Sequence, residues 1–220
     1  MQRLTHFPNT CIECFLGALR PKRLDPQSDA FYIAHKMILT PELIDRLLAQ
    51  EPITDLWPWA SGNEQAIEDH WKDIVHKICR RLTLRFKAVF NHYGSGYASY
   101  VDTWFYREDP AFKIGPDDCY SGLVVLYSRL SPYYVLGEGA KCWHSRGGSS
   151  YLPHFHFLDQ FSHPAVKELI PEVDAIMAQS GLQRLFKTDL AEAMPTSTAI
   201  PTILADAPWV HFDALFYWED

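Results

Sequence analysis

Residues 119–159 read CYSGLVVLYSRLSPYYVLGEGAKCWHSRGGSSYLPHFHFLD and contain the most strand-like run of the chain. Two runs rich in β-branched, leucine and aromatic residues, 123–127 and 133–136, flank the short break SRLSP at 128–132. Such a pattern is typical of two strands joined by a turn. A third run, 151–158, alternates aromatic residues with histidine. We therefore expect the middle of an antiparallel sheet in this stretch.

Two segments outside this stretch have the periodicity of an amphipathic helix. Between residues 63 and 90, apolar side chains recur three or four positions apart, which predicts one long helix with a single apolar stripe. A second stripe follows residues 162–164 and stops at Gly181, a residue suited to the end of a helix. Pro171 lies inside this stripe, so the second helix begins late or kinks there.

We expect shorter strands to complete the sheet and a short helix and a loop to pack on it. The sequence TPE at 40–42 suits the start of a helix that ends near residue 50, because it offers a cap, a first-turn proline and a first-turn acid. In the loop that follows, Trp57 and Trp59 are expected to pack as a lid on the core. Strand-like composition marks residues 31–39, 97–106 and 211–218.

The bulk composition is that of an ordinary globular protein. The chain has 220 residues, of which 47% are hydrophobic and 21% charged, and it is long enough to bury a core without staples. It shows no internal repeat and no clear linker. We therefore predict one α+β domain over residues 1–220, with an irregular segment at 1–30. In this prediction the long helix and a second helix from the C-terminal half pack on an antiparallel sheet.

The net charge and the cysteine content limit which kinds of partner the protein can bind and in which cell compartment it is expected. A net charge of −7 disfavours a nucleic-acid partner, because binding phosphate needs a surplus of lysine and arginine, and it suits a basic partner. No run reaches the roughly 18 apolar residues of a membrane span, and the N-terminus lacks the regions of a signal peptide. The five cysteines are scattered, so we expect free thiols in the cytoplasm.

Two motifs have residues that bind metals. The CxxC at 11–14 is half of a zinc site, but no second pair accompanies it. If 151–158 is a strand, His154 and His156 point to the same face, where a third ligand would complete a metal site. The other interpretation is that this pair faces solvent or a partner. A small metal-dependent enzyme therefore stays as the alternative function; otherwise we expect no cofactor.

Other catalytic patterns are not found. The glycine-serine segments at 94–96 and 147–149 do not match G-x-S-x-G, and no phosphate-binding glycine motif is present. Paired carboxylates at 108–109, 117–118 and 219–220 are expected in turns or at the end of the chain, without the burial that raises the pKa of a general acid. Tyrosine and tryptophan on strands suit a protein interface, which favours a non-enzymatic binding protein.

Five segments carry a resemblance to a known family: SGLVV at 121–125, SRLSPYY at 128–134, GEG at 137–139, IPTIL at 200–204 and FDALFYWED at 212–220. In these segments the chain resembles bacterial immunity proteins and is similar to the immunity protein 52 family of polymorphic toxin systems. The resemblance covers mainly residues 94–220. It implies a non-enzymatic, cytoplasmic antitoxin that neutralises a cognate toxin, an effector nuclease delivered by type VI secretion.

The candidate toxin contacts are acidic and aromatic residues that we expect on exposed loops. An acidic surface would associate quickly with the basic active-site face of a nuclease. The sequence determines neither the mode of inhibition nor the oligomeric state. The candidates are Asp117, Asp118, Tyr133, Tyr134 and Glu138.

Overall fold

The computed structural model describes most of the chain beyond residue 38. The described residues all belong to one compact unit, which spans Lys36–Asp220. The irregular segment at 1–30, the CxxC and nearly all of the strand expected at 31–39 lie outside them, so a single domain over the whole chain stays a prediction. The described ranges are 39–94, 96–115, 118–144, 147–195 and 197–220.

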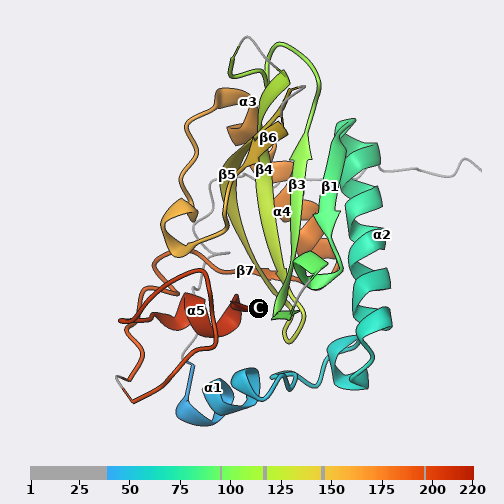
Figure 1. Ribbon diagram of the computed structural model, residues 1–220. Helices are drawn as coiled ribbons and strands as arrows, with labels where there is room; N and C mark the ends of the chain where they lie inside the picture. Colours follow the sequence, from blue (N-terminus) through green and yellow to red (C-terminus); the bar gives the residue numbers. More distant parts are fainter. Residues whose placement is uncertain (1–38, 95, 116–117, 145–146, 196) are drawn as a thin grey trace, which may run out of the picture. The chain divides into compact units, whose positions relative to one another are not determined.

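A sheet forms the centre of this unit (Figure 1). The predicted hairpin is confirmed, since β4 and β5 pair in antiparallel register from Asp118 opposite Trp143 to Tyr127 opposite Tyr134. The short β7 (Gln183–Arg184) joins β5 in parallel. A separate pair consists of β2 (Tyr97–Ala98) and β8 (Trp218–Glu219). The main path runs through β1 (Arg85–Val89), β3 (Tyr100–Tyr106), β4 (Asp118–Ser128), β5 (Tyr133–His144) and β6 (Gly147–Ser150).

Five helices and three 3-10 turns surround the sheet within the described ranges. The α+β class is confirmed, and the long α2 and the C-terminal-half α4 pack on the sheet as predicted. None of the helices described is long and apolar enough to span a membrane. The helices are α1 (Pro41–Leu48), α2 (Glu64–Leu82), α3 (Pro164–Lys167), α4 (Ile170–Gln179) and α5 (His211–Leu215), and the turns are η2 (Trp59–Ser61), η3 (His92–Gly94) and η4 (Phe155–Phe157).

The long helix begins where the sequence predicts but ends early. Asn63 Oδ1 accepts a hydrogen bond from the Ala66 N–H at 3.3 Å and caps the first turn of α2. At the other end Thr83 takes the left-handed conformation, with φ of 53°, and its N–H donates to the Cys79 carbonyl. The predicted continuation to residue 90 is wrong, because the apolar residues after Thr83 belong to β1.

The second helical stripe is divided at its proline. α3 ends at Lys167, and α4 begins at Ile170, so Pro171 lies in the first turn of a new helix, where its missing N–H is not needed. Gly181 follows the last turn with φ of 78°, as expected for the end of a helix.

Two predicted strands are wrong. Residues 151–154 form no regular element, and η4 follows them. The Phe157 ring of η4 lies on Gly137 of β5, where a Cβ would meet it at 2.0 Å. The stretch 211–218 is mostly helical. Its start is fixed by the Asp213 carboxylate, which accepts from the Val210 N–H at 2.8 Å, and only Trp218–Glu219 is a strand.

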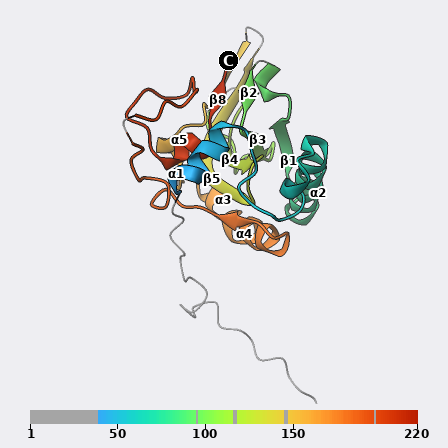
Figure 2. The same cartoon turned by 90° about the horizontal axis from the view of Figure 1, so that it is seen from below.

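The two faces of the main sheet have different covers, and α4 and α5 lie on opposite sides of it (Figure 2). The face that we call the helix face packs Val101, Phe105 and Leu123 under α2 and α4. The opposite face, which we call the aromatic face, includes Tyr100 and Trp104 and packs against α1, α5 and irregular segments.

Two cysteines are paired across the hairpin. Cys119 and Cys142 face each other in the β4–β5 register, with Cα atoms 4.0 Å apart, and form a disulfide. The expectation that every cysteine is free is therefore wrong for this pair, because it ignored the strand register that brings them together. Cys79 of α2 is a free thiol, and burial raises its pKa to about 11.

Candidate protein-interaction surface

A buried tryptophan fastens the loop between α1 and α2 to the turn of the central hairpin. Trp59 is 2% exposed, and its Nε1–H donates to the Ser128 carbonyl oxygen at 3.2 Å. Nearby, the Ile53 N–H donates to the Leu130 carbonyl oxygen at 2.9 Å. These bonds fix the backbone of the loop on a rigid part of the sheet. The prediction that Trp59 packs as a lid is confirmed.

Trp57, two residues earlier, is presented to solvent. Its side chain is 68% exposed, and that of the adjacent Leu56 is 55% exposed. The indole meets the ring of His70 on α2 edge-on, with centroids 5.6 Å apart at an interplanar angle of 81°. The prediction that Trp57 belongs to the lid is therefore wrong. Its neighbour Trp59 occupies the buried position, and Trp57 leaves a large apolar ring on the surface.

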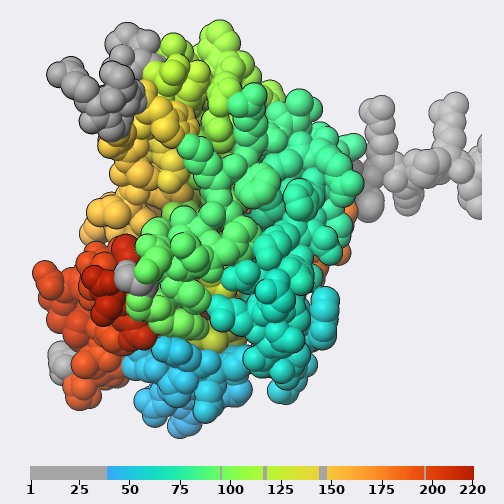
Figure 3. Space-filling view, turned by 45° about the vertical axis from the view of Figure 1, so that its right-hand side comes forward, coloured from blue at the N-terminus to red at the C-terminus, as the bar shows by residue number. Residues whose placement is uncertain are grey.

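The part of the chain that contains Trp57 is rich in acidic residues. Residues 40–73 contain eight carboxylates and two basic residues, so this segment has a net charge of −6, whereas the whole chain has −7. Figure 3 shows α1 in blue and the segment that follows it in cyan, leading along the surface toward α2. We call Asp55, Leu56, Trp57, Asp69 and Asp73, all exposed, the Trp57 surface.

The basic residues of this region are already engaged by the chain itself. The Arg46 guanidinium bonds to the Pro52 carbonyl and lies 3.9 Å from the Glu51 carboxylate. The Lys72 ammonium lies 3.4 Å from Glu68 and 3.3 Å from Asp69. Because both cations are paired locally, the remaining carboxylates give the surface a net negative potential that a basic partner can neutralise.

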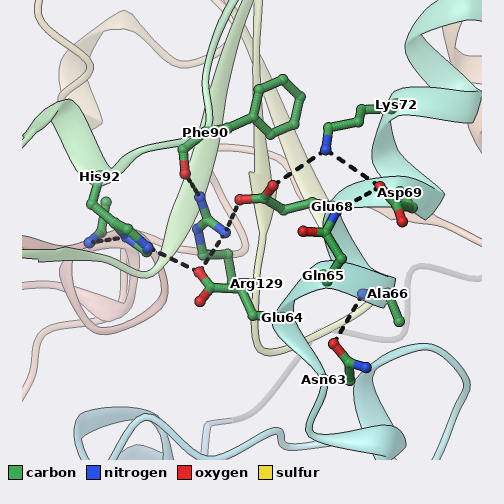
Figure 4. A network of polar contacts seen from close by, with 11 residues as sticks. Asn63, Glu64, Gln65, Ala66, Glu68, Asp69, Lys72, Phe90, His92 and Arg129 are labelled. Carbon is green, nitrogen blue, oxygen red and sulfur yellow. Dashed lines mark hydrogen bonds and ion pairs between the residues drawn. The ribbon is translucent and has the colours of Figure 1, made fainter.

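A buried arginine, Arg129, connects the turn of the central hairpin to α2 (Figure 4). Arg129 is 2% exposed, and its guanidinium donates to the Glu64 carboxylate at 2.8 Å and the Glu68 carboxylate at 3.1 Å. It also donates to the Phe90 carbonyl oxygen at 2.6 Å. His92 Nε2 lies 2.9 Å from the same Glu64 carboxylate. Arg129, in the turn of the hairpin, thus connects the sheet to α2. Sequence reasoning missed this role of Arg129.

The candidate contacts from the hairpin do not lie on exposed loops. Tyr134 is 2% exposed in β5, and its hydroxyl donates to the Asp174 carboxylate at 2.8 Å. Tyr133 is half-buried at the start of the same strand, and Asp118 is exposed at the start of β4. Asp117 lies outside the described residues. The prediction that these side chains are exposed is therefore wrong for Tyr134, whereas Asp118 is exposed as predicted.

The Glu138 carboxylate forms hydrogen bonds with other residues of the chain. Its carboxylate accepts from the Ser121 hydroxyl at 2.8 Å and from the backbone N–H groups of Ser162 and His163 at 2.7 and 2.9 Å. Burial acts to raise the pKa of Glu138, but these hydrogen bonds outweigh it and lower the pKa below the usual value. Glu138 positions the start of α3, and the placement on an exposed loop is wrong.

The two histidines of the alternative metal site lie on a 3-10 turn and not on one strand face. His154 Nδ1 accepts from the His156 N–H at 3.2 Å, and the ring centroids are 5.9 Å apart. Both line a cavity of about 520 Å³ that Asp213 also borders. Across the described residues, no group of three or more histidine, cysteine, aspartate or glutamate side chains is arranged to hold a metal ion.

Asp102 is a buried carboxyl that sequence reasoning missed. It is 4% exposed in β3 and accepts from the Tyr151 hydroxyl at 2.6 Å and the Tyr93 hydroxyl at 3.0 Å. Burial raises its pKa, the opposite of Glu138. The burial of Asp102 could have been predicted from the sequence. Side chains two positions apart on a strand share a face, so Asp102 lies on the same inward-pointing face as Tyr100 and Trp104.

No family model, curated protein or solved structure matches this chain. The geometry of the chain itself must therefore indicate its function. An exposed indole on a fixed loop is a feature that protein interfaces use, since tryptophan is enriched among their hot spots. Of the surfaces predicted from the sequence, none combines exposure, a large apolar ring and charge in this way.

Proposed function

We propose that this chain is a non-enzymatic immunity protein that binds and neutralises a cognate protein toxin through the Trp57 surface. The observation that carries the proposal is the 68% exposure of Trp57 on a loop fastened by Trp59. Tryptophan is among the residues most enriched in interface hot spots. Since the loop is already held, little conformational entropy is lost when a partner covers the ring.

The charge of the surface supports a basic toxin. A nuclease must hold phosphate groups, so the surface around its active site carries lysine and arginine. An acidic partner meets such a surface quickly and covers it. We therefore propose an effector nuclease delivered by type VI secretion, the class of toxin that the resemblance to immunity proteins implies.

The proposed target places the protein in the cytoplasm, where nucleic acid is exposed to a nuclease. Disulfides persist in oxidising compartments, whereas the cytoplasm keeps thiols reduced. The structure joins Cys119 and Cys142 in a disulfide. If the chain acts in the reducing cytoplasm, we expect this bond to be reduced in the cell and to form only under oxidising conditions. Rapid alkylation of intact cells, followed by peptide mass spectrometry, measures this. A bonded pair in living cells would contradict the cytoplasmic assignment.

The test of the proposal is protection from the toxin encoded beside this gene. The wild-type chain should restore growth of cells that express the neighbouring protein, and Trp57→Ala should restore it far less. Leu152→Ala is the matched control, since Leu152 is an apolar side chain of 64% exposure in another part of the chain. If the wild type neither protects nor forms a complex, the antitoxin proposal fails.

A charge reversal tests the acidic part of the surface separately. Asp55→Lys should slow association with the toxin and weaken its dependence on salt, because steering by opposite charge acts on the association rate. Glu168→Lys makes the same change at an exposed position beyond the Trp57 surface. Equal association rates for the two variants would show that the acids around Trp57 do not steer the partner.

A further inference from the structure

Four aromatic rings pack together on the aromatic face, away from the Trp57 surface. The rings of Trp104 and Tyr106 stack with centroids 4.2 Å apart and an interplanar angle of 17°. The ring of Trp143 lies 5.9 Å from Tyr106 and 6.2 Å from Tyr120. These residues come from β3, β4 and β5, so three neighbouring strands hold the rings rigidly.

A cavity of about 360 Å³ opens over three of these rings. This volume lies within the range of small-molecule sites. Tyr120 and Trp143 are half-buried, and the charged side chains at the rim are exposed, so a ligand can enter from solvent. The lining residues, which we call the aromatic cavity, are Lys87, Tyr106, Glu108, Asp118, Tyr120 and Trp143.

The chain already places a cation on one of the rings. The Lys87 Nζ lies 3.7 Å from the centroid of the Trp143 ring, where the negative face of the indole attracts it. Burial lowers the pKa of Lys87, while the charge of Glu108 acts to raise it. The ring face and its surroundings therefore accept an ammonium group at close range.

We propose that the aromatic cavity binds a small organic ammonium group, which takes the place of the Lys87 ammonium on Trp143. The Lys87 side chain is exposed and forms no ion pair within the described ranges, so it can move into water at little cost. Lys141 stays in place, because its Nζ donates to the Ser150 hydroxyl at 2.7 Å.

The charge of the rim favours a cation over an anion. Asp118 is exposed and forms no ion pair among the residues described, and Glu108 is shared with Arg85 and with the Tyr106 hydroxyl at 3.4 Å. Aromatic rings with neighbouring carboxylates are the chemistry that recognises alkylated ammonium groups. An anion would be repelled by the Asp118 carboxylate and by the negative faces of the rings.

Calorimetric titration with choline tests the proposal, with the neutral isostere 3,3-dimethylbutan-1-ol as the control probe. We expect the wild type to bind choline and not the alcohol. Lys87→Met should bind choline more tightly, on the order of two- to fivefold, because it removes the competing ammonium. Trp143→Leu should abolish binding. Asp118→Asn should weaken it, and this exposed position keeps the test informative if the tryptophan variant fails to fold.

The source of the ammonium group is distinguished by a second titration. A short peptide with trimethyllysine that binds at least tenfold more tightly than choline would identify a modified protein side chain as the ligand. Equal affinities would identify a free small molecule. The proposal is overturned if choline does not bind, if the alcohol binds as well as choline, or if Lys87→Met binds choline no more tightly than the wild type.

Discussion

The two faces of the central sheet achieve burial by different means. On the helix face, aliphatic side chains of the strands meet the apolar stripes of α2 and α4. On the aromatic face, tyrosine and tryptophan rings pack with buried polar groups such as Asp102, under short helices and irregular segments. The helix face follows mainly from apolar periodicity, to which single hydrogen bonds such as that from Trp71 to Thr103 are added. The aromatic face depends on individual hydrogen bonds, and its rings and charges are also what a ligand can recognise.

The largest expected effect lies on the helix face. Trp71 of α2 is fully buried; its ring stacks on Tyr127 at 4.5 Å and its Nε1–H donates to the Thr103 hydroxyl at 2.8 Å. Trp71→Ala should lower the free energy of unfolding by about 3–5 kcal/mol, measured in urea. Trp57→Ala should change it by less than about 0.5 kcal/mol. Similar losses for the two variants would contradict their assignment to core and surface.

The disulfide should have the next largest effect. Because side chains alternate along a strand, Cys119 and Cys142 share the helix face with Leu123. Reduction of the bond should cost about 2–4 kcal/mol of unfolding free energy, since the open chain has more conformational freedom. Urea titrations with and without reductant measure it. A variant with serine at both positions is the control, and reductant should leave its stability unchanged.

The carboxyl groups of Asp102 and Glu138 should give smaller effects, and these should change with pH in opposite directions. Burial raises the pKa of Asp102 in the folded state above the ordinary value of an aspartate, so the folded chain keeps this proton to higher pH than the unfolded chain. Stability from this group is therefore present below that value and is lost as the pH rises. The advantage of the wild type over Asp102→Asn should shrink between pH 4 and pH 7 in urea titrations, and a growing advantage would contradict the buried position.

Glu138 on the helix face should behave in the opposite way. Hydrogen bonds that outweigh burial lower its pKa in the folded state below the ordinary value of a glutamate. Its contribution to stability is therefore present above that ordinary value and is lost as the pH falls through the folded value. The advantage of the wild type over Glu138→Gln should shrink on acidification from pH 6 to pH 3. A flat difference across this range would show that the bonds to Ser121, Ser162 and His163 do not favour the carboxylate.

The sequence predicts the helix face better than the aromatic face, for a physical reason. The stripe of α2 and the apolar runs of the hairpin repeat with fixed periods, so their positions follow from local sequence. What stops α2 at Thr83, or makes 211–215 helical, is a single conformation or a single hydrogen bond, such as the one from Val210 to Asp213. Apolar periodicity does not report such local features.

The candidate site was predictable only in part. The excess of acid in residues 40–73 is visible in the sequence, and so are Trp57 and Trp59. Which of the two tryptophans is buried depends on the Ser128 carbonyl, 69 residues away, that accepts from Trp59. Likewise, Glu138 was expected to face a partner, but distant backbone N–H groups at 162 and 163 occupy its carboxylate. Contacts of this range follow from the fold and not from composition.

The central claim is that Trp57 anchors a toxin, and a binding measurement tests it most directly. The purified neighbour-encoded toxin is titrated calorimetrically with the wild type, Trp57→Ala and the control Leu152→Ala. The account predicts that Trp57→Ala raises the dissociation constant by about 30-fold or more, equivalent to about 2 kcal/mol, and that Leu152→Ala leaves it unchanged. Wild-type affinity in Trp57→Ala would contradict the account.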